Sequence, residues 1–310
     1  MSEPQQSLTT RAWLLLGLLA LVWGASFLSN RAALAEVGVL TTVAFRVAGA
    51  AVFLWAYVVV KGLPVPAGIR AKLAFFVQGI LNNVIPFTLI VWGQQHIDSG
   101  LASILNGATA IFAVLLVPFF FRDERLTLRK SIGVALGFAG VTVTIGISAL
   151  ADLDLTSLGQ LAVLGAAVSY AFASIFARAA LRGIRPEVSA AGMLTGASIV
   201  MLPWALMAEG VPTLQYAATT WAALAYLAFA ASALAYILYY KVLALAGAGN
   251  LSLVTLLIPP IAIVLGTLVY QETLPVSAYL GLALIAAGMI VIDGRFEKFI
   301  HKPSGAKDFS

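Results

Sequence analysis

The sequence has no cysteine, only two histidines and few charged residues, and each shortage excludes a class of protein. Without cysteine there is no disulfide framework, no cysteine-ligated zinc and no cysteine nucleophile. His96 and His301 lie far apart, which excludes the His-Glu-x-x-His motif of a metalloprotease. Charged residues make up 10% of the chain, against about 25% in soluble domains. A soluble fold would therefore lack the polar residues that cover its surface.

Apolar residues are abundant instead. They make up 61% of the 310 residues, and the mean hydropathy is +1.00, which excludes a disordered chain. Runs of about 20 apolar residues are typical of transmembrane helices. The sequence contains ten such runs, at residues 12–29, 40–60, 71–92, 99–121, 130–149, 158–178, 188–208, 217–240, 247–270 and 276–293. We therefore expect an all-α membrane protein with ten transmembrane helices.

Lysine and arginine are distributed unequally between the connecting segments. With ten spans, sixteen of the 18 fall on the side of both termini, Arg31 falls on the other side, and Arg46 lies within the second span. The positive-inside rule then places both termini in the cytoplasm. Short loops and few charges suit a bacterial inner membrane. The net charge of +5 is thus explained by orientation, and we expect no nucleic-acid partner.

The two halves of the chain resemble each other in an ordered way. An offset of 147 residues aligns Arg31-Ala32-Ala33-Leu34 with Arg178-Ala179-Ala180-Leu181. An offset of 148 residues aligns several residues after the fourth and ninth spans, namely Glu124 with Glu272, Gly133 with Gly281, and Gly140 with Gly288. The pattern predicts a first repeat at residues 1–150, a second at 151–294, and a basic cytoplasmic tail at 295–310.

Each predicted repeat has five spans, so the two copies cross the membrane in opposite orientations. Such inverted repeats are common in secondary transporters, where the substrate site lies at the repeat interface near the middle of the bilayer. The fold class expected is therefore ten transmembrane helices arranged as two inverted five-helix repeats.

Short motifs point to a known family. Leu21-Val22-Trp23-Gly24-Ala25-Ser26-Phe27, Ala44-Phe45-Arg46 and Asp123-Glu124-Arg125-Leu126-Thr127 occur in the first half, and Pro259-Pro260 and Gln271-Glu272-Thr273-Leu274 in the second. With these motifs the chain resembles the EamA-type ten-helix exporters of the drug/metabolite transporter superfamily, and among them the YddG-type aromatic amino acid exporters. The resemblance covers nearly the whole chain and implies export of amino acids or other metabolites. The second half departs from the pattern, since Tyr170-Ala171-Phe172-Ala173 replaces Trp-Gly-Ala-Ser and Met193 stands at the position of Arg46.

Polar side chains inside a membrane usually face the bundle interior or a water-filled cavity. Polar and aromatic positions on spans 1, 2, 3, 4, 6 and 8 give ten candidate substrate-binding residues: Trp23, Ser26, Arg46, Gln78, Asn82, Asn83, Asn106, Tyr170, Ser232 and Tyr236. A serine in a membrane helix often only bonds backbone or a neighbouring helix. Arg46 either meets a substrate carboxylate or the carbonyl end of a broken helix, or it is a structural clamp.

Prolines and paired glutamates are candidates for movement. Pro86 cannot donate to the carbonyl of Asn82, four residues before it, so we expect a free carbonyl beside the two amides. Pro259 and Pro260 predict a helix break in the ninth span. Glu124 and Glu272, at equivalent repeat positions near opposite membrane faces, are either gate latches or solvated helix ends.

These patterns together predict an exporter that works by alternating access on small amphipathic metabolites. Among these, aromatic or hydrophobic amino acids are the expected substrates. No Asp or Glu lies deep in a span, which favours facilitated diffusion or exchange; the alternative is a proton-coupled multidrug efflux carrier. We expect no enzyme activity, no cofactor and no metal site. The expected partners are a small-molecule substrate and the lipid bilayer, with the protein a monomer or weak homodimer.

Overall fold

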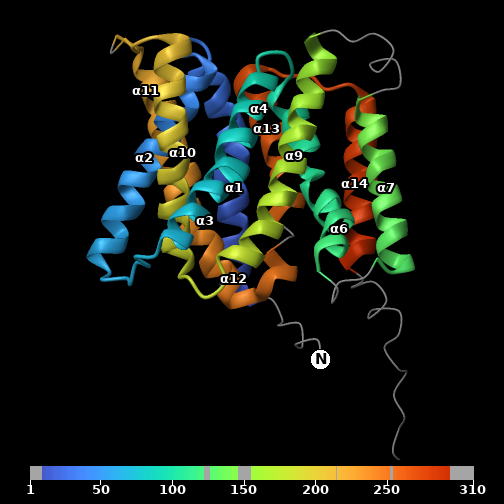
Figure 1. Cartoon of the computed structure of the whole chain (residues 1–310). Helices are drawn as coiled ribbons and strands as arrows, with labels where there is room; N and C mark the ends of the chain where they lie inside the picture. Colours follow the sequence, from blue (N-terminus) through green and yellow to red (C-terminus); the bar gives the residue numbers. More distant parts are fainter. Residues whose placement is uncertain (1–8, 122–125, 146–154, 214, 252–253, 294–310) are drawn as a thin grey trace, which may run out of the picture.

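The computed structural model describes residues 9–121, 126–145, 155–213, 215–251 and 254–293. Its helices form a bundle whose long axes run roughly alongside one another (Figure 1). Eight helical segments are long and apolar enough to cross a membrane, and two shorter apolar helices complete the ten. The prediction of an all-α, ten-helix membrane protein is confirmed. Most spans start and end within a few residues of the expected ones, but the eighth runs to Leu251 and the ninth begins only at Val254, later than the expected ends at 240 and 247.

The first five spans fill the first half of the chain. They are α1 (Thr10–Ala33), α2 (Val39–Val60), α3 (Ile69–Gly79) with η1 (Ile80–Val84) and α4 (Ile85–Gly93), α5 (Ser99–Gly107) with α6 (Thr109–Phe120), and α7 (Leu128–Ile145). The next five are α9 (Leu155–Ala180), α10 (Pro186–Glu209), α11 (Ala218–Ala225) with η2 (Tyr226–Leu234) and α12 (Ala235–Leu251), α13 (Val254–Tyr270), and α14 (Val276–Asp293). Spans 3, 4 and 8 are thus each built from more than one helical piece.

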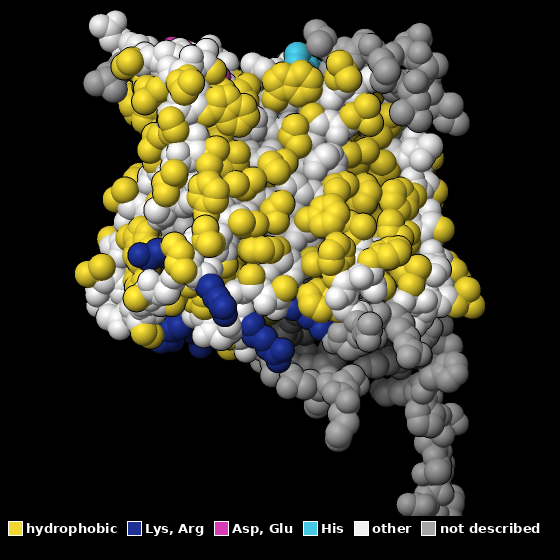
Figure 2. Space-filling model, viewed as in Figure 1, with side chains coloured by type: hydrophobic (Ala, Val, Ile, Leu, Met, Phe, Trp, Pro, Cys, Tyr) yellow, Lys and Arg dark blue, Asp and Glu magenta, His cyan; other side chains and the backbone are white. Residues whose placement is uncertain are grey.

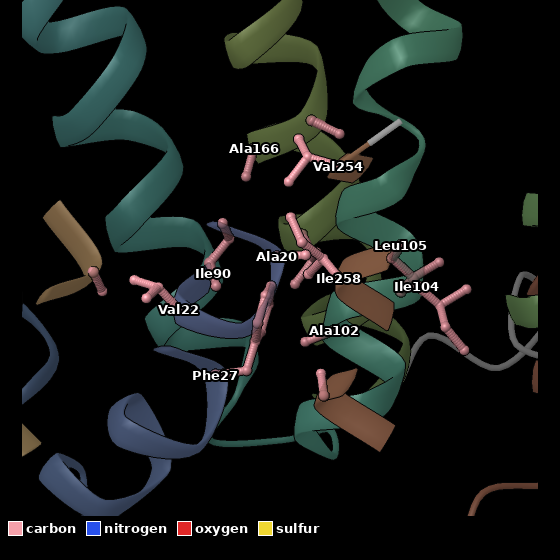
Figure 3. Close-up of a cluster of buried hydrophobic side chains, with 14 of the residues drawn as sticks. Ala20, Val22, Phe27, Ile90, Ala102, Ile104, Leu105, Ala166, Val254 and Ile258 are labelled. Carbon is pink, nitrogen blue, oxygen red and sulfur yellow. The ribbon is translucent and has the colours of Figure 1, made fainter. Parts of the chain in front are cut away.

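The bundle is bounded by two pairs of helices. α7 packs along α14 on one side of Figure 1, and α2 packs along α10 on the other. α1, α4, α5, α9 and α13 lie between them, and their apolar side chains, including Phe27, Ile90 and Ile258, meet in the cluster of Figure 3. The polar positions on spans 1, 3, 6 and 8 are therefore held in the middle of the molecule, away from lipid.

The α7–α14 seam has the symmetry of an inverted repeat. A methyl group added at Gly133 would lie 2.6 Å from the carbonyl oxygen of Gly288, and one at Gly140 would lie 2.7 Å from that of Gly281. Gly281 corresponds to Gly133, and Gly288 to Gly140. The two contacts are therefore related by a two-fold rotation. Only glycine lets the two backbones approach this closely, as small residues do in many membrane interfaces.

Charge divides the molecule into two ends. Lys and Arg gather in the lower part of Figure 2, Asp, Glu and His are seen at its upper edge, and apolar side chains cover most of the face between them. We call the upper end, which includes Glu36, Asp98, Glu209 and Glu272, the acidic end, and the other the basic end. A wide apolar belt between two polar ends is the surface that a multi-pass membrane protein presents to lipid.

Candidate functional site

Arg46 connects the two halves of the chain near the middle of the bundle. It lies on α2 and is 6% exposed; its Nε donates a hydrogen bond to the Ser232 Oγ on η2 at 3.0 Å. Its guanidinium carbon lies 3.8 Å from the centre of the Phe87 ring on α4, which is a cation–π contact. In the part of the chain that the structure describes, no carboxylate pairs with Arg46. Its positive charge is therefore available to an anionic group of a ligand.

Two adjacent amides on η1 converge on one phenol. The Nδ2 atoms of Asn82 and Asn83 donate to the Oη of Tyr236, on α12, at 2.9 and 3.3 Å. Asn83 is fully buried, and its Oδ1 has no hydrogen-bond partner among the described residues. A buried acceptor without a partner is costly, so Asn83 has capacity left for a donor group of a ligand. We refer to Arg46, Asn82, Asn83, Ser232 and Tyr236 as the central cluster.

The central cluster includes residues of two π-helical segments at equivalent repeat positions. Shifting η1 by 147 residues places it at 227–231, inside η2. In η1 the N–H of Ile85 donates to the carbonyl of Ile80, five residues back. At this π-helical spacing Pro86 leaves the carbonyl of Leu81 without a backbone donor. The predicted free carbonyl of Asn82 stays a prediction.

Donors from the two central helices cover the carbonyls of these π-helical segments. The Ser169 Oγ on α9 donates to the Leu81 carbonyl of η1 at 2.7 Å. The Trp23 Nε1 on α1 donates to the Ala231 carbonyl of η2 at 3.2 Å. The two donors lie one position apart in the repeats, because Trp23 corresponds to Tyr170, the residue after Ser169. Each bond joins one repeat to the other.

Two of the predicted aromatic residues lie near the central cluster, and one predicted serine does not contribute to it. Trp23 is partly buried against Tyr239, with ring centres 6.0 Å apart. Tyr170 is partly buried and lies within electrostatic range of Arg46. The Ser26 hydroxyl donates to the carbonyl of Trp23 at 2.6 Å, within its own helix. The donor of the Ser26 hydroxyl is thus used by its own backbone, and the predicted role of Ser26 in substrate binding stays a prediction.

The remaining predicted polar residues have mixed outcomes. Gln78 is buried one turn before Asn82, and its Oε1 has no partner among the described residues. The Oδ1 of Asn106 has none either, and the Thr109 hydroxyl donates to the Asn106 carbonyl where α5 ends and α6 begins. No hydrogen bond joins Asn106 to the central cluster within the described ranges. Its predicted role in binding stays a prediction.

The helix break expected in the ninth span is absent from the structure. Pro259 and Pro260 both lie inside α13, which continues from Val254 to Tyr270. Pro259 is buried and lies near Gly107 of α5. The prediction of a break at this pair is wrong, because helix packing against α1 and α5 keeps α13 continuous despite the two missing N–H groups. Glu124, the other predicted gate residue, lies outside the described residues.

Glu272 closes the acidic end between three spans. Its carboxylate accepts hydrogen bonds from the backbone N–H groups of Ser99 and Gly100, both at 3.1 Å, at the start of α5. It also forms an ion pair with Arg31, in the last turn of α1. The Glu272 side chain is only 2% exposed, and the Arg31 guanidinium stacks 4.6 Å from the centre of the Tyr270 ring. We call the Arg31–Glu272 contact the latch.

A network of amide side chains lies next to the latch. The Asn30 Nδ2 donates to the Gln94 Oε1 at 2.8 Å, and the Gln94 Nε2 donates to the Phe27 carbonyl at 2.9 Å. The same Nε2 lies 3.3 Å from the Ser99 Oγ. Sequence reasoning missed Gln94, although the polar run Gln94-Gln95-His96 at the end of a span was a visible signal. The network ties α1, α4 and α5 together.

Two further glutamates cap helices at the acidic end. Glu36 accepts from the backbone N–H of Ala217 and from the Thr220 hydroxyl, and these bonds lower the pKa of its carboxyl. Glu209 accepts from the backbone N–H groups of Leu40 and Thr41, at 2.9 and 2.8 Å. With the latch, these caps connect six of the ten spans at this end. These contacts therefore hold the helices together at the acidic end.

The arrangement as a whole defines a membrane transporter. Ten apolar helices form two inverted repeats, polar groups from both repeats meet at mid-membrane, and one end is closed by ionic and capping contacts. The model of the EamA-like transporter family matches residues 11–146 and 157–293, and the chain belongs to this family.

Relatives of the chain are named as transporters. An uncharacterized transporter of Bacillus subtilis (strain 168), YvbV, is 28% identical over 291 residues, covering 92% of each chain. A probable amino-acid metabolite efflux pump of Escherichia coli (strain K12) is 30% identical over 202 residues, covering 62% of this chain and 67% of that protein. A probable terminal-alkyne amino-acid exporter of Streptantibioticus cattleyicolor is 28% identical over 67% of this chain and 68% of that protein. One crystal structure covering 94% of this chain and 99% of its own has a TM-score of 0.66 at 17% identity, which shows the same fold.

Proposed function

We propose that this transporter exports amino acids and similar small zwitterions with apolar side chains. Within this class, the proposed preferred substrates are aromatic or hydrophobic amino acids. The observation that supports this most is the composition of the central cluster. It offers one positive charge, two amides, a hydroxyl and a phenol, and no carboxylate among the described residues. The names of the amino-acid efflux relatives agree with this substrate class.

Each part of a neutral amino acid finds a suitable group there. Arg46 pairs with the substrate carboxylate, since a guanidinium binds a carboxylate through charge-assisted hydrogen bonds. The free Oδ1 of Asn83 accepts from the ammonium group. Trp23 and Tyr170 offer ring surface to an apolar side chain. A multivalent anion would find too few cations, and a lipophilic cation would be repelled by Arg46, which disfavours multidrug efflux.

The proposed orientation follows from the charge distribution. The basic end lies in the cytoplasm with both termini, and the acidic end lies outside a bacterial inner membrane. With the latch closed, the central cluster is separated from the outside, and substrate reaches it from the cytoplasm. Opening of the latch, together with closure of the basic end, exposes the cluster to the outside. Two inverted repeats permit this exchange because they pack in two nearly equivalent ways.

We further propose that transport is facilitated diffusion or exchange. No Asp or Glu lies in the interior of a helix that the structure describes, and proton-coupled carriers usually place such a group along the path. The measurement is amino acid flux in proteoliposomes with and without an imposed pH gradient. Flux that depends strictly on the gradient would contradict the proposal and favour proton coupling.

A pair of variants tests the role of the central cluster. Asn82→Ala removes the shorter of the two bonds to Tyr236, and we expect at least a tenfold loss of flux with an unchanged membrane yield. Thr142→Ala is the matched control, because Thr142 is exposed and bonds only the Phe138 carbonyl of its own helix. Wild-type flux in Asn82→Ala would refute the assignment of Asn82 to the substrate path.

A further inference from the structure

A cavity of about 390 Å³ lies at the acidic end, beyond the latch. Its lining includes Arg31 of α1, Gln95, His96 and Asp98 of the α4–α5 connection, Leu101 of α5 and Thr156 of α9. Its volume is in the range of small-molecule sites. Glu272 does not line it, so the cavity is separate from the buried side of the latch. We call this cavity the vestibule.

The Arg31 guanidinium is held in place, but not all of its N–H donors are used. Glu272 and the Tyr270 ring fix its guanidinium from the buried side. Its contact with Asp98, at 3.3 Å, is long and half-exposed, with exposed side-chain fractions of 38% and 41%. All the hydrogen bonds that Arg31 makes to the described residues use one nitrogen, Nη1. Its other N–H groups remain available to a carboxylate that enters the vestibule.

The charge balance favours a ligand that also has a positive group. Within the described residues, Asp98 and Glu272 supply two carboxylates near the single cation Arg31, and His96 is the remaining titratable group of the lining. Burial, and after it the neighbouring carboxylate of Glu272, raises the pKa of Asp98. The two carboxylates share the one guanidinium of Arg31, so the group lacks one positive charge. An ammonium group beside Asp98 would supply that charge, whereas a simple anion would add to the excess.

We propose that the vestibule is an external binding site for the ammonium and carboxylate groups of an amino acid, separate from the central cluster. The ligand carboxylate binds Arg31 in place of Asp98, and the ligand ammonium binds Asp98. An amino acid occupies this site while the latch is closed, and an exported one passes through it after the latch opens. The choice of an amino acid rests on the proposed function, whereas the need for both charges rests on Arg31 and Asp98 alone.

The absence of cysteine from the chain allows a direct test. Thr156→Cys places a single thiol on the exposed wall of the vestibule, and Val211→Cys places one on the exposed α10–α11 connection at the same end. Each variant is reconstituted and labelled with a membrane-impermeant maleimide, with and without external L-phenylalanine. We expect L-phenylalanine to slow the labelling of Thr156→Cys at least threefold and to leave Val211→Cys unchanged.

Ligand analogues and one further variant test the two charges. Phenethylamine lacks the carboxylate and phenylpropionate lacks the ammonium. For each, the concentration that half-protects Thr156→Cys should be at least tenfold higher than for L-phenylalanine. Adding Asp98→Asn should weaken protection by L-phenylalanine to a similar degree. The proposal is overturned if a panel of neutral amino acids gives no protection, or if phenylpropionate protects as well as L-phenylalanine.

A parallel counterflow measurement on the wild-type protein separates this proposal from the proposed function. Amino acid counterflow without protection of Thr156→Cys overturns the vestibule site and leaves the proposed function standing. Protection without counterflow supports the vestibule site and contradicts the proposed function. Absence of both overturns both.

Discussion

Replacing Glu272 by glutamine should open the acidic end of the transporter. In the structure one oxygen of Glu272 accepts from Arg31 and from the N–H of Ser99, and the other accepts from the N–H of Gly100. A glutamine has only one such oxygen, so its NH2 group must face a backbone donor, and the ion pair is lost. Glu272→Gln therefore removes both the charge and part of the cap of α5.

The expected size of the effect of Glu272→Gln follows from how deeply the Arg31–Glu272 pair is buried. The Glu272 side chain is buried but the Arg31 side chain is 38% exposed, so losing this charge-assisted contact costs about 1.5–3 kcal/mol, less than a fully buried pair would. If these contacts exist only while the acidic end is closed, the ratio of open to closed molecules rises by about tenfold to a hundredfold. Gly266→Ala is an independent way to the same result, because the added methyl group would clash with the Glu272 carboxylate.

The assay uses a single cysteine behind the latch. Ser103 lies on α5 one turn beyond Ser99 and is fully buried, so Ser103→Cys reports opening through its reactivity with an external, membrane-impermeant maleimide. We expect labelling at least tenfold faster when Glu272→Gln is added. Val211→Ala is the control, since Val211 is 87% exposed on the α10–α11 connection at the same end and makes no hydrogen bond through its side chain. Equal labelling rates in Ser103→Cys with and without Glu272→Gln would refute the assignment of a latch.

Three further predictions concern the central cluster and the helix seam. Arg46→Gln should raise the half-saturating amino acid concentration in flux assays at least tenfold, because a charge-assisted bond to the substrate carboxylate is lost; an unchanged value would leave Arg46 as a structural clamp. Tyr236→Phe should lower the melting temperature by several degrees, because it removes the acceptor of two amides. Each group left unpaired costs about 1–3 kcal/mol. Thermal unfolding in detergent measures the shift, and a change below one degree would count against both of these hydrogen bonds. Gly281→Leu should abolish the folded yield because its side chain would meet the carbonyl of Gly140, whereas Gly17→Ala, with open space around it, should fold normally in the same size-exclusion assay.

The sequence predicted the large features of this fold well. Hydropathy runs of about 20 residues sufficed for the ten spans, because a lipid-exposed helix must satisfy its own backbone and present apolar side chains. The inverted repeat was visible in spaced identities, and the Gly133–Gly288 contact gives these a physical reason. Arg46, Asn82, Asn83, Ser232 and Tyr236 were all found as polar positions inside spans.

The partners of these residues could not be predicted. Which faces meet depends on how ten helices pack, and neither Phe87 beneath Arg46 nor Ser169 on the Leu81 carbonyl has a sequence signal of its own. The π-helical register of η1, which leaves the Leu81 carbonyl without a backbone donor, was not predicted either. Pro259 and Pro260 were misread because neighbouring helices keep α13 continuous. Local pattern identifies the polar residues, and packing decides what each one does.

Counterflow of radiolabelled L-phenylalanine into proteoliposomes preloaded with the unlabelled amino acid tests the central claim most directly. We predict saturable uptake without an imposed pH gradient, abolished by Asn82→Ala and retained in Thr142→Ala. Absence of counterflow with every neutral amino acid, or uptake restricted to lipophilic cations, would contradict the assignment of the central cluster to amino acid export.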